Sequence, residues 1–184
     1  MRQPPTMVQL SQVIETILAE KVDVKGAIDP KASLMKDMNL DSLDMIELSF
    51  SLEEFFGFEF ATKDAFETLD AATQGAVLQA GQFTELGRQI LMRRAPELVD
   101  KALPDQLSPM ILQQFYSVET FARLIREFYL AAPDVCPRTG EPVVARDFKI
   151  VSESSNEPVG TLTGDDILDA WVETMAAELG TKTP

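Results

Sequence analysis

Ser42 is the residue of this 184-residue chain best placed to do chemistry, because the segment Leu40-Asp41-Ser42-Leu43 is predicted to open a helix there. The first backbone N–H groups of a helix have no partner within it, and the aligned peptide dipoles add partial positive charge. A phosphodiester on this hydroxyl would therefore sit in a ready anion site. The alternative is a helix cap, since a serine side chain can accept a bond from the second or third N–H.

The stretch after Ser42 is unusually acidic. Between Asp37 and Phe60 the chain has no Lys or Arg and carries seven acids: Asp37, Asp41, Asp44, Glu47, Glu53, Glu54 and Glu59. Like charges at helical spacing repel one another, so stability alone does not favour this composition. A basic surface on a partner protein would make it useful, and a cap alone does not explain it.

The segments from Ser33 to Leu43 and from Leu48 to Phe60 resemble the acyl carrier protein family, over roughly residues 7–70. One difference is Asn39, where the family often has glycine, but asparagine tolerates a left-handed backbone better than most residues. The resemblance implies a four-helix bundle, a covalent phosphopantetheine arm on Ser42, and acyl cargo carried as a thioester. The pathway implied is of the fatty-acid, lipid or polyketide type.

The resemblance also implies roles for the residues around Ser42. A phosphopantetheinyl transferase would modify the serine, and acyl-transferring and chain-extending enzymes with basic docking surfaces would then use the carrier. Asp41 would position the serine and take part in docking. Apolar contacts would come from Leu43 and Met45, and charged contacts from Asp44, Glu47 and Glu53.

Composition limits the other classes of function. A net charge of -14 and a pI near 4.3 argue against nucleic acid and anionic membranes as partners. The chain has no histidine, which removes the commonest general base and metal ligand. An esterase with Ser42 as nucleophile would also lack the Gly-x-Ser-x-Gly elbow. We therefore expect no catalytic residues and no enzyme activity of its own.

The single cysteine predicts neither a disulfide nor a metal site. Cys136-Pro137-Arg138-Thr139-Gly140 resembles part of a zinc ribbon, but one thiol cannot build that site, and we expect a surface or half-buried side chain. No apolar run approaches the roughly 18 residues that a membrane span needs. The N-terminus also lacks the apolar core of a signal peptide. We expect a cytoplasmic monomer without membrane insertion.

Helical periodicity predicts a mainly α fold. Helices are expected at 7–21, at 42–56 with a cap at Gly57, at 62–69 with Thr62 as cap, and at 117–130 as the last bundle helix. A competing register places the last helix at 73–79. On the second helix the inner face is expected to contain Ile46, Phe50, Leu52, Phe55 and Phe56.

Two additions enlarge the bundle, which is expected over 1–132. An insertion of about 70–115 includes helices at 84–94 and from Ser108-Pro109; it either widens the bundle or forms a lid over acyl cargo. An extension over 133–184 is expected to contain a hairpin with strand character at 143–151 and a helix from Thr163 to Leu179. That helix either docks on the bundle, with Trp171 as a packing anchor, or offers a face to a protein partner. Because these additions are large, an unmodified carrier fold that binds a protein as a regulatory module is the alternative function.

Overall fold

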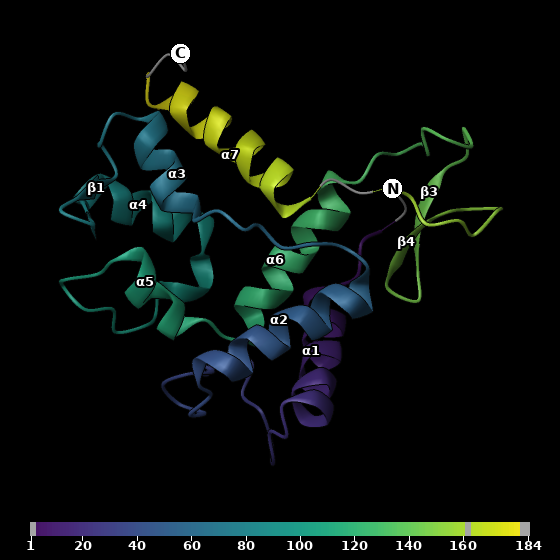
Figure 1. Cartoon of the computed structure of the whole chain (residues 1–184), viewed down its shortest axis with the longest axis horizontal. Coiled ribbons are helices and arrows are strands. Elements are labelled where there is room, and N and C mark those ends of the chain that lie inside the picture. Colours follow the sequence, from purple (N-terminus) through teal and green to yellow (C-terminus); the bar gives the residue numbers. More distant parts are fainter. Residues whose placement is uncertain (1–2, 161–162, 181–184) are drawn as a thin grey trace.

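The computed structural model describes residues 3–160 and 163–180, and it is mainly helical, as the sequence predicts (Figure 1). Two short antiparallel hairpins accompany the helices, β1 (Leu78–Gln79) with β2 (Gln82–Phe83) and β3 (Val143–Arg146) with β4 (Lys149–Ser152). The helices are α1 (Met7–Lys21), α2 (Ser42–Phe56), α3 (Ala65–Ala72), α4 (Glu85–Arg94), α5 (Pro109–Leu112), α6 (Val118–Ala131) and α7 (Gly164–Glu178), with 3₁₀ turns η1 (Pro96–Leu98) and η2 (Gln113–Phe115).

Local capping chemistry sets the helix bounds. Gly57 ends α2 in the left-handed conformation, with φ of 78°, which glycine adopts without steric cost. The expected start of the third helix is wrong. Asp64, not Thr62, caps α3, because its carboxylate accepts hydrogen bonds from the N–H groups of Phe66 and Glu67, and the helix runs to Ala72.

The first hydrophobic cluster is formed by α1, α2 and α6. Leu10 and Ile14 of α1, Leu48 and Leu52 of α2, and Ile125 of α6 are completely buried in it. The last bundle helix is therefore α6, as the main register predicts, while 73–79 forms a turn and β1 instead.

Aromatic rings fill the space between α2, the linker after it, and α6. Phe58 stacks on Phe128 with ring centroids 3.8 Å apart, and Phe60 packs edge-on against both rings. The β3–β4 hairpin closes this end of the cluster, where Phe148 meets the ring of Phe56 and the Tyr129 hydroxyl donates to the Phe148 carbonyl at 2.6 Å. The hairpin is thus part of the same core.

Cys136 is buried in this cluster with only 2% of its surface exposed, so the expectation of a surface or half-buried thiol is wrong. The turn that follows explains the burial. Gly140 donates its N–H to the Cys136 carbonyl, and Cys136 donates its own to the Glu141 carbonyl, which folds the segment back on itself. The sequence alone indicates only a turn-rich segment at this position.

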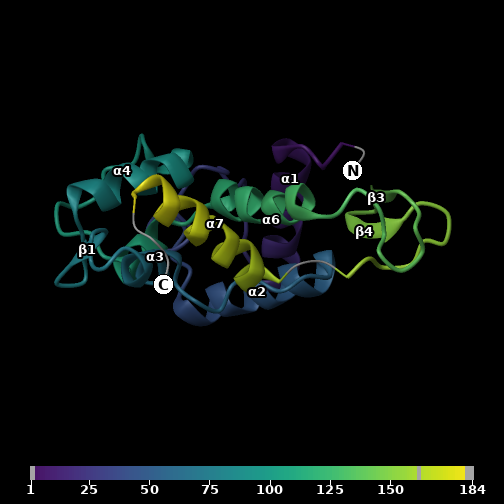
Figure 2. The same ribbon diagram turned by 90° about the horizontal axis from the view of Figure 1, so that it is seen from above.

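A second hydrophobic cluster is built from α3, the insertion and α7. Its fully or nearly fully buried members include Leu69 of α3, Leu91 and Leu98 of the insertion, and Leu168 of α7. Figures 1 and 2 show this group at the end of the molecule opposite the β3–β4 hairpin. The insertion therefore packs together with α3 and α7 in a core that is separate from the first cluster.

Partly buried charges connect the two clusters. Arg123 of α6 pairs with Glu97 at 3.1 Å and with Glu127 at 2.8 Å, and Glu127 also pairs with Arg94 of α4 at 3.2 Å. The Arg94 guanidinium lies 4.2 Å from the ring centroid of Trp171 on α7. Trp171 thus acts as a packing residue that joins α7 to the insertion.

The start of α7 is attached to the linker between α2 and α3. Gly164 donates its N–H to the Glu59 carbonyl at 2.8 Å, and a Cβ at Gly164 would lie 2.1 Å from the Ala61 nitrogen. The Asp165 carboxylate accepts bonds from the N–H and hydroxyl of Thr62, and the hydroxyl bond lowers the pKa of Asp165. Within the described ranges no helix is long and apolar enough to cross a membrane.

Candidate functional site

Ser42 is the exposed first residue of α2, and it is not the cap. Asp41 is the cap, since one oxygen of its carboxylate accepts bonds from the N–H groups of Leu43 at 2.7 Å and Asp44 at 3.0 Å. Asp44 returns a bond by accepting the Asp41 N–H at 2.8 Å, which completes a capping box with aspartate in place of the usual glutamate. The capping role considered for Ser42 is therefore filled by its neighbour.

This cap corrects the expected anion site. The N–H groups of Leu43 and Asp44 are already bonded to Asp41, so they are not available to a phosphodiester on Ser42. The carboxylates of Asp41 and Asp44 beside the serine also disfavour a further negative charge close to the helix. The exposed position of Ser42 leaves room for an attached group, but these two N–H groups would not bind it.

The backbone before Ser42 is held by a turn and by the insertion. Asn39 has φ of 60°, in the left-handed region that the sequence predicts for it. Ser33 is buried, and its hydroxyl donates to the Gln114 carbonyl at 2.5 Å, while the Leu34 N–H donates to the Tyr116 carbonyl at 2.9 Å. The end of the insertion thus fixes the segment that presents Ser42.

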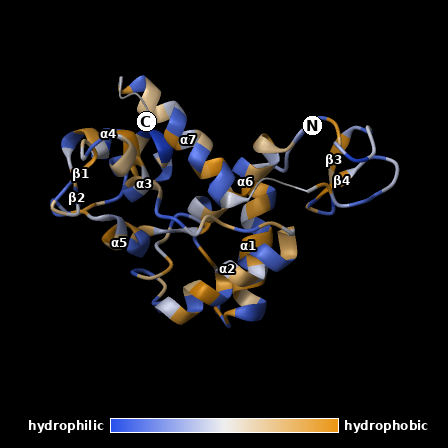
Figure 3. Cartoon of the chain, turned by 45° about the horizontal axis from the view of Figure 1, so that its top comes forward, coloured by the Kyte–Doolittle hydropathy of each residue, from blue (hydrophilic) through white to orange (hydrophobic). Residues whose placement is uncertain are grey.

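The outer face of α2 carries an apolar stripe that includes the expected docking residue Leu43 and two residues expected to face inward, Ile46 and Phe50. Leu43, Ile46 and Phe50 are 71%, 52% and 66% exposed, and hydrophobic residues recur along α2 (Figure 3). The prediction that Ile46 and Phe50 face inward is wrong, and Phe55 is exposed too. The buried stripe is the row Leu48, Leu52 and Phe56. The acids Glu47 and Glu54 share the outer face with Phe50, a spacing that could have indicated its exposure.

The remaining predicted docking residues are not equivalent. Asp41 and Glu47 are exposed, and Asp44 is half-buried by its bond to Asp41. Met45 is half-buried and packs against the first cluster. Glu53 is half-buried, and its carboxylate accepts the Phe60 N–H at 2.8 Å, so it holds the linker after α2.

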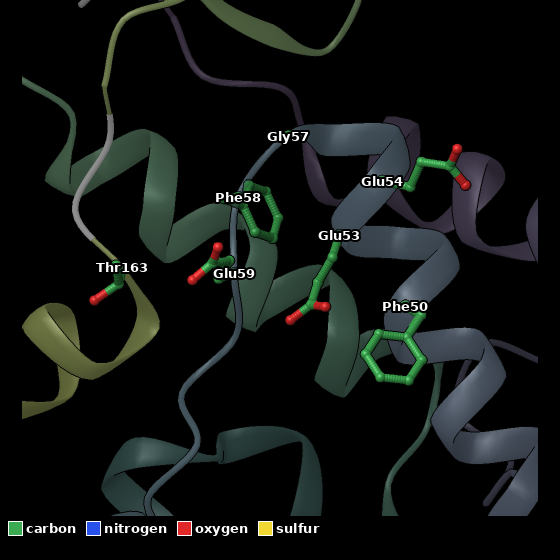
Figure 4. Close-up of a pocket in the computed structure, with 7 residues that line it drawn as sticks. All are labelled: Phe50, Glu53, Glu54, Gly57, Phe58, Glu59 and Thr163. Carbon is green, nitrogen blue, oxygen red and sulfur yellow. The ribbon is translucent and has the colours of Figure 1, made fainter.

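A hollow of about 500 Å³ lies at the C-terminal end of the outer face of α2 (Figure 4). Phe50 forms one side, and Thr163 at the start of α7 lies across from it. The carboxylates of Glu53 and Glu59 project into the space between them. The C-terminal extension therefore contributes to the same acidic and apolar surface as α2.

The segment that contains Ser42 is similar to known proteins. The family model described as "Phosphopantetheine attachment site" matches residues 12–72, about a third of the chain. The chain is similar to the "Acyl carrier protein" of Helicobacter pylori strain G27, with 40% identity over 57 residues, 30% of this chain and 73% of that protein.

Two further relatives give the same result. The "Acyl carrier protein" of Coprothermobacter proteolyticus is 41% identical over 54 residues, 29% of this chain and 66% of that protein. The "Acyl carrier protein" of Rubrobacter xylanophilus is 38% identical over 58 residues, 31% of this chain and 72% of that protein. No solved structure gives a significant match to the chain.

Proposed function

The chain belongs to the acyl carrier protein family, whose members hold a covalent phosphopantetheine group, and we propose that Ser42 is the residue that carries it. The observation that supports this assignment is the cap: Asp41 satisfies the helix terminus, so the exposed Ser42 hydroxyl has no capping role to lose. The group supplies a thiol on which cargo is held as a thioester.

The cargo that we propose is an acyl intermediate of fatty-acid, lipid or polyketide-type synthesis. The carrier itself performs no catalysis. A phosphopantetheinyl transferase loads it, and acyl-transferring and chain-extending enzymes act on the cargo in the cytoplasm, with the carrier as a monomer. The absence of histidine from the whole sequence supports a role that leaves acid-base chemistry to the partners.

Docking is proposed to use the outer face of α2. Leu43, Ile46 and Phe50 form the apolar centre, and Glu47 and Glu54 supply charge beside it. Protein interfaces commonly combine buried aromatic anchors with a polar rim, and charge complementarity raises the association rate. A partner with an apolar contact ringed by Lys and Arg fits this face.

Intact-mass measurement after co-expression with a broad-specificity phosphopantetheinyl transferase tests the attachment residue. We expect the wild-type chain to gain the mass of one phosphopantetheine and Ser42→Ala to gain nothing. Ser51→Ala is the matched control, because Ser51 lies on the same helix outside the attachment motif. A wild-type chain that stays unmodified would favour the unmodified, protein-binding module, and a modified Ser42→Ala chain would move the attachment elsewhere.

A further inference from the structure

We propose that the hollow between the β3–β4 hairpin and the end of α2 binds a small carboxylate with an apolar body. The hollow has a volume of about 370 Å³, within the range of small-molecule sites. Its apolar lining includes Phe58, Val151 and Val159, and two cations, Arg146 and Lys149, also line it. It lies beyond the C-terminal end of α2, and Ser42 is at the other end of that 15-residue helix, roughly 22 Å away.

The position of the two cations is unfavourable for the hairpin by itself. Arg146 and Lys149 are directly paired across the antiparallel strands, so their side chains leave the same face. Like charges directly opposite each other destabilise a strand pair. An anion between them would turn this repulsion into two attractive contacts, and an arginine guanidinium matches the two oxygens of a carboxylate.

The turn between these cations is also conformationally costly. Asp147 and Phe148 have φ of 48° and 60°, as in the hairpin turn that prefers Asn-Gly. A phenylalanine rarely adopts such an angle. Packing of Phe148 against Phe56 and the bond from Tyr129 to its carbonyl hold the turn in place. The core therefore imposes the geometry that brings the two cations to the edge of the hollow.

Neutral groups accept the hydrogen bonds of both cations. Arg146 donates to the Asn156 side-chain oxygen at 2.9 Å and to the Glu153 carbonyl at 3.0 Å, and Lys149 donates to the Glu54 carbonyl at 3.1 Å. Neither cation forms an ion pair with a described residue, although the Glu54 carbonyl in the last turn of α2 places partial negative charge beside Lys149. Asp147 also lines the hollow, so the three charged side chains there sum to one positive charge, against -14 for the whole chain.

Titration of the full-length chain with hexanoate, followed by amide NMR shifts, tests the proposal. We expect saturable shifts at residues 56–58 and 146–151 and at Asn156 and Val159, with a dissociation constant on the order of 1 mM for so small a ligand. Acetate should bind more weakly because it lacks the apolar body. Hexylamine, which has the same body and the opposite charge, should leave these amides unshifted.

Variants then assign the binding to the two cations. Arg146→Gln should weaken hexanoate binding about tenfold or more, as expected for loss of a charged hydrogen bond, and Lys149→Gln should act in the same direction. Arg138→Gln is the matched control, because Arg138 lies before the same hairpin and pairs with Glu157 outside the hollow. The affinity of Arg138→Gln for hexanoate should stay within about twofold of wild type.

Because Lys149 also contacts α2, Lys149→Gln could unfold the chain, and Arg146→Gln is then the variant that tests the site. Saturation at other amides, no saturable shift, equal binding of hexylamine, or an equal loss in Arg138→Gln would overturn the site.

Discussion

Phe50 and Phe56 are the same residue type on the same helix, and the structure predicts opposite consequences for their loss. Phe56 is 2% exposed within the first cluster, so Phe56→Ala should cost about 3 to 5 kcal/mol in free energy of unfolding. Phe50 is 66% exposed, so Phe50→Ala should stay within roughly 0.5 kcal/mol of wild type. If Phe50 is an aromatic anchor of the docking face, Phe50→Ala should instead reduce the free energy of binding to the transferase by about 2 kcal/mol, which is a roughly thirtyfold increase in Kd.

Two assays separate these effects. Urea unfolding at equilibrium gives the free energy of unfolding, and the steady-state rate of phosphopantetheine transfer gives kcat/KM for each variant. Phe50→Ala should lower kcat/KM, mainly through KM, with unfolding unchanged. If Phe50→Ala destabilises the fold as much as Phe56→Ala, the assignment of the two faces of α2 is refuted. If its transfer kinetics match wild type, Phe50 is not a docking residue, although the face assignment stands.

The other predictions concern the cap, the charge, the α7 contact and the insertion. Ser42→Ala should leave urea unfolding nearly unchanged, whereas Asp41→Ala should cost about 0.5 to 2 kcal/mol; the reverse order would contradict the cap assignment. At low salt, Glu47→Lys should raise the KM of the transferase for this carrier, and the difference from wild type should shrink as added salt screens the wild-type attraction. An unchanged KM at low salt would show that docking uses another surface. Because the pKa of Asp165 is lowered on folding, its contribution to stability should be full above the ordinary value of 3.8 and lost as pH falls through the lowered pKa. The stability difference between wild type and Asp165→Asn should therefore shrink in acid, and a pH-independent difference would contradict this. The melting temperature should not depend on acyl-chain length, because Leu86, Ile90, Leu91 and Ile111 of the insertion pack in the second cluster; a stepwise rise with chain length would support a lid.

The helices that begin at strong caps could be predicted from the sequence. α6 and α7 begin where Ser117 and Thr163 form capping boxes, and the bounds of α1 and α2 match the periodic apolar residues. These signals are local, so they need no knowledge of the rest of the fold. The position of Ser42 at the start of a helix is predictable for the same reason.

The wrong predictions concern residues whose burial or hydrogen bonding depends on contacts with distant parts of the chain. α2 has apolar residues on two faces, and the packing of α1 and α6 selects the Leu48 row over Ile46 and Phe50. Thr62 looks like a cap, but Asp165, more than 100 positions later, binds its hydroxyl. Within the site, sequence alone could not tell whether Asp41 or Ser42 caps α2, because both are good capping residues.

The makeup of the second cluster has a consequence for how the chain folds during synthesis. α3 and the insertion leave the ribosome long before α7, which supplies Leu168, Val172 and Met175 to the same core. At about 5 to 20 residues per second, the apolar surface of α3 that packs against α7, including the Phe66 ring beside Trp171, stays uncovered for several seconds. Long-range contacts of this kind slow folding and expose the nascent chain to aggregation. A nascent chain stalled before α7 should therefore be a substrate for chaperones, while the finished chain should not.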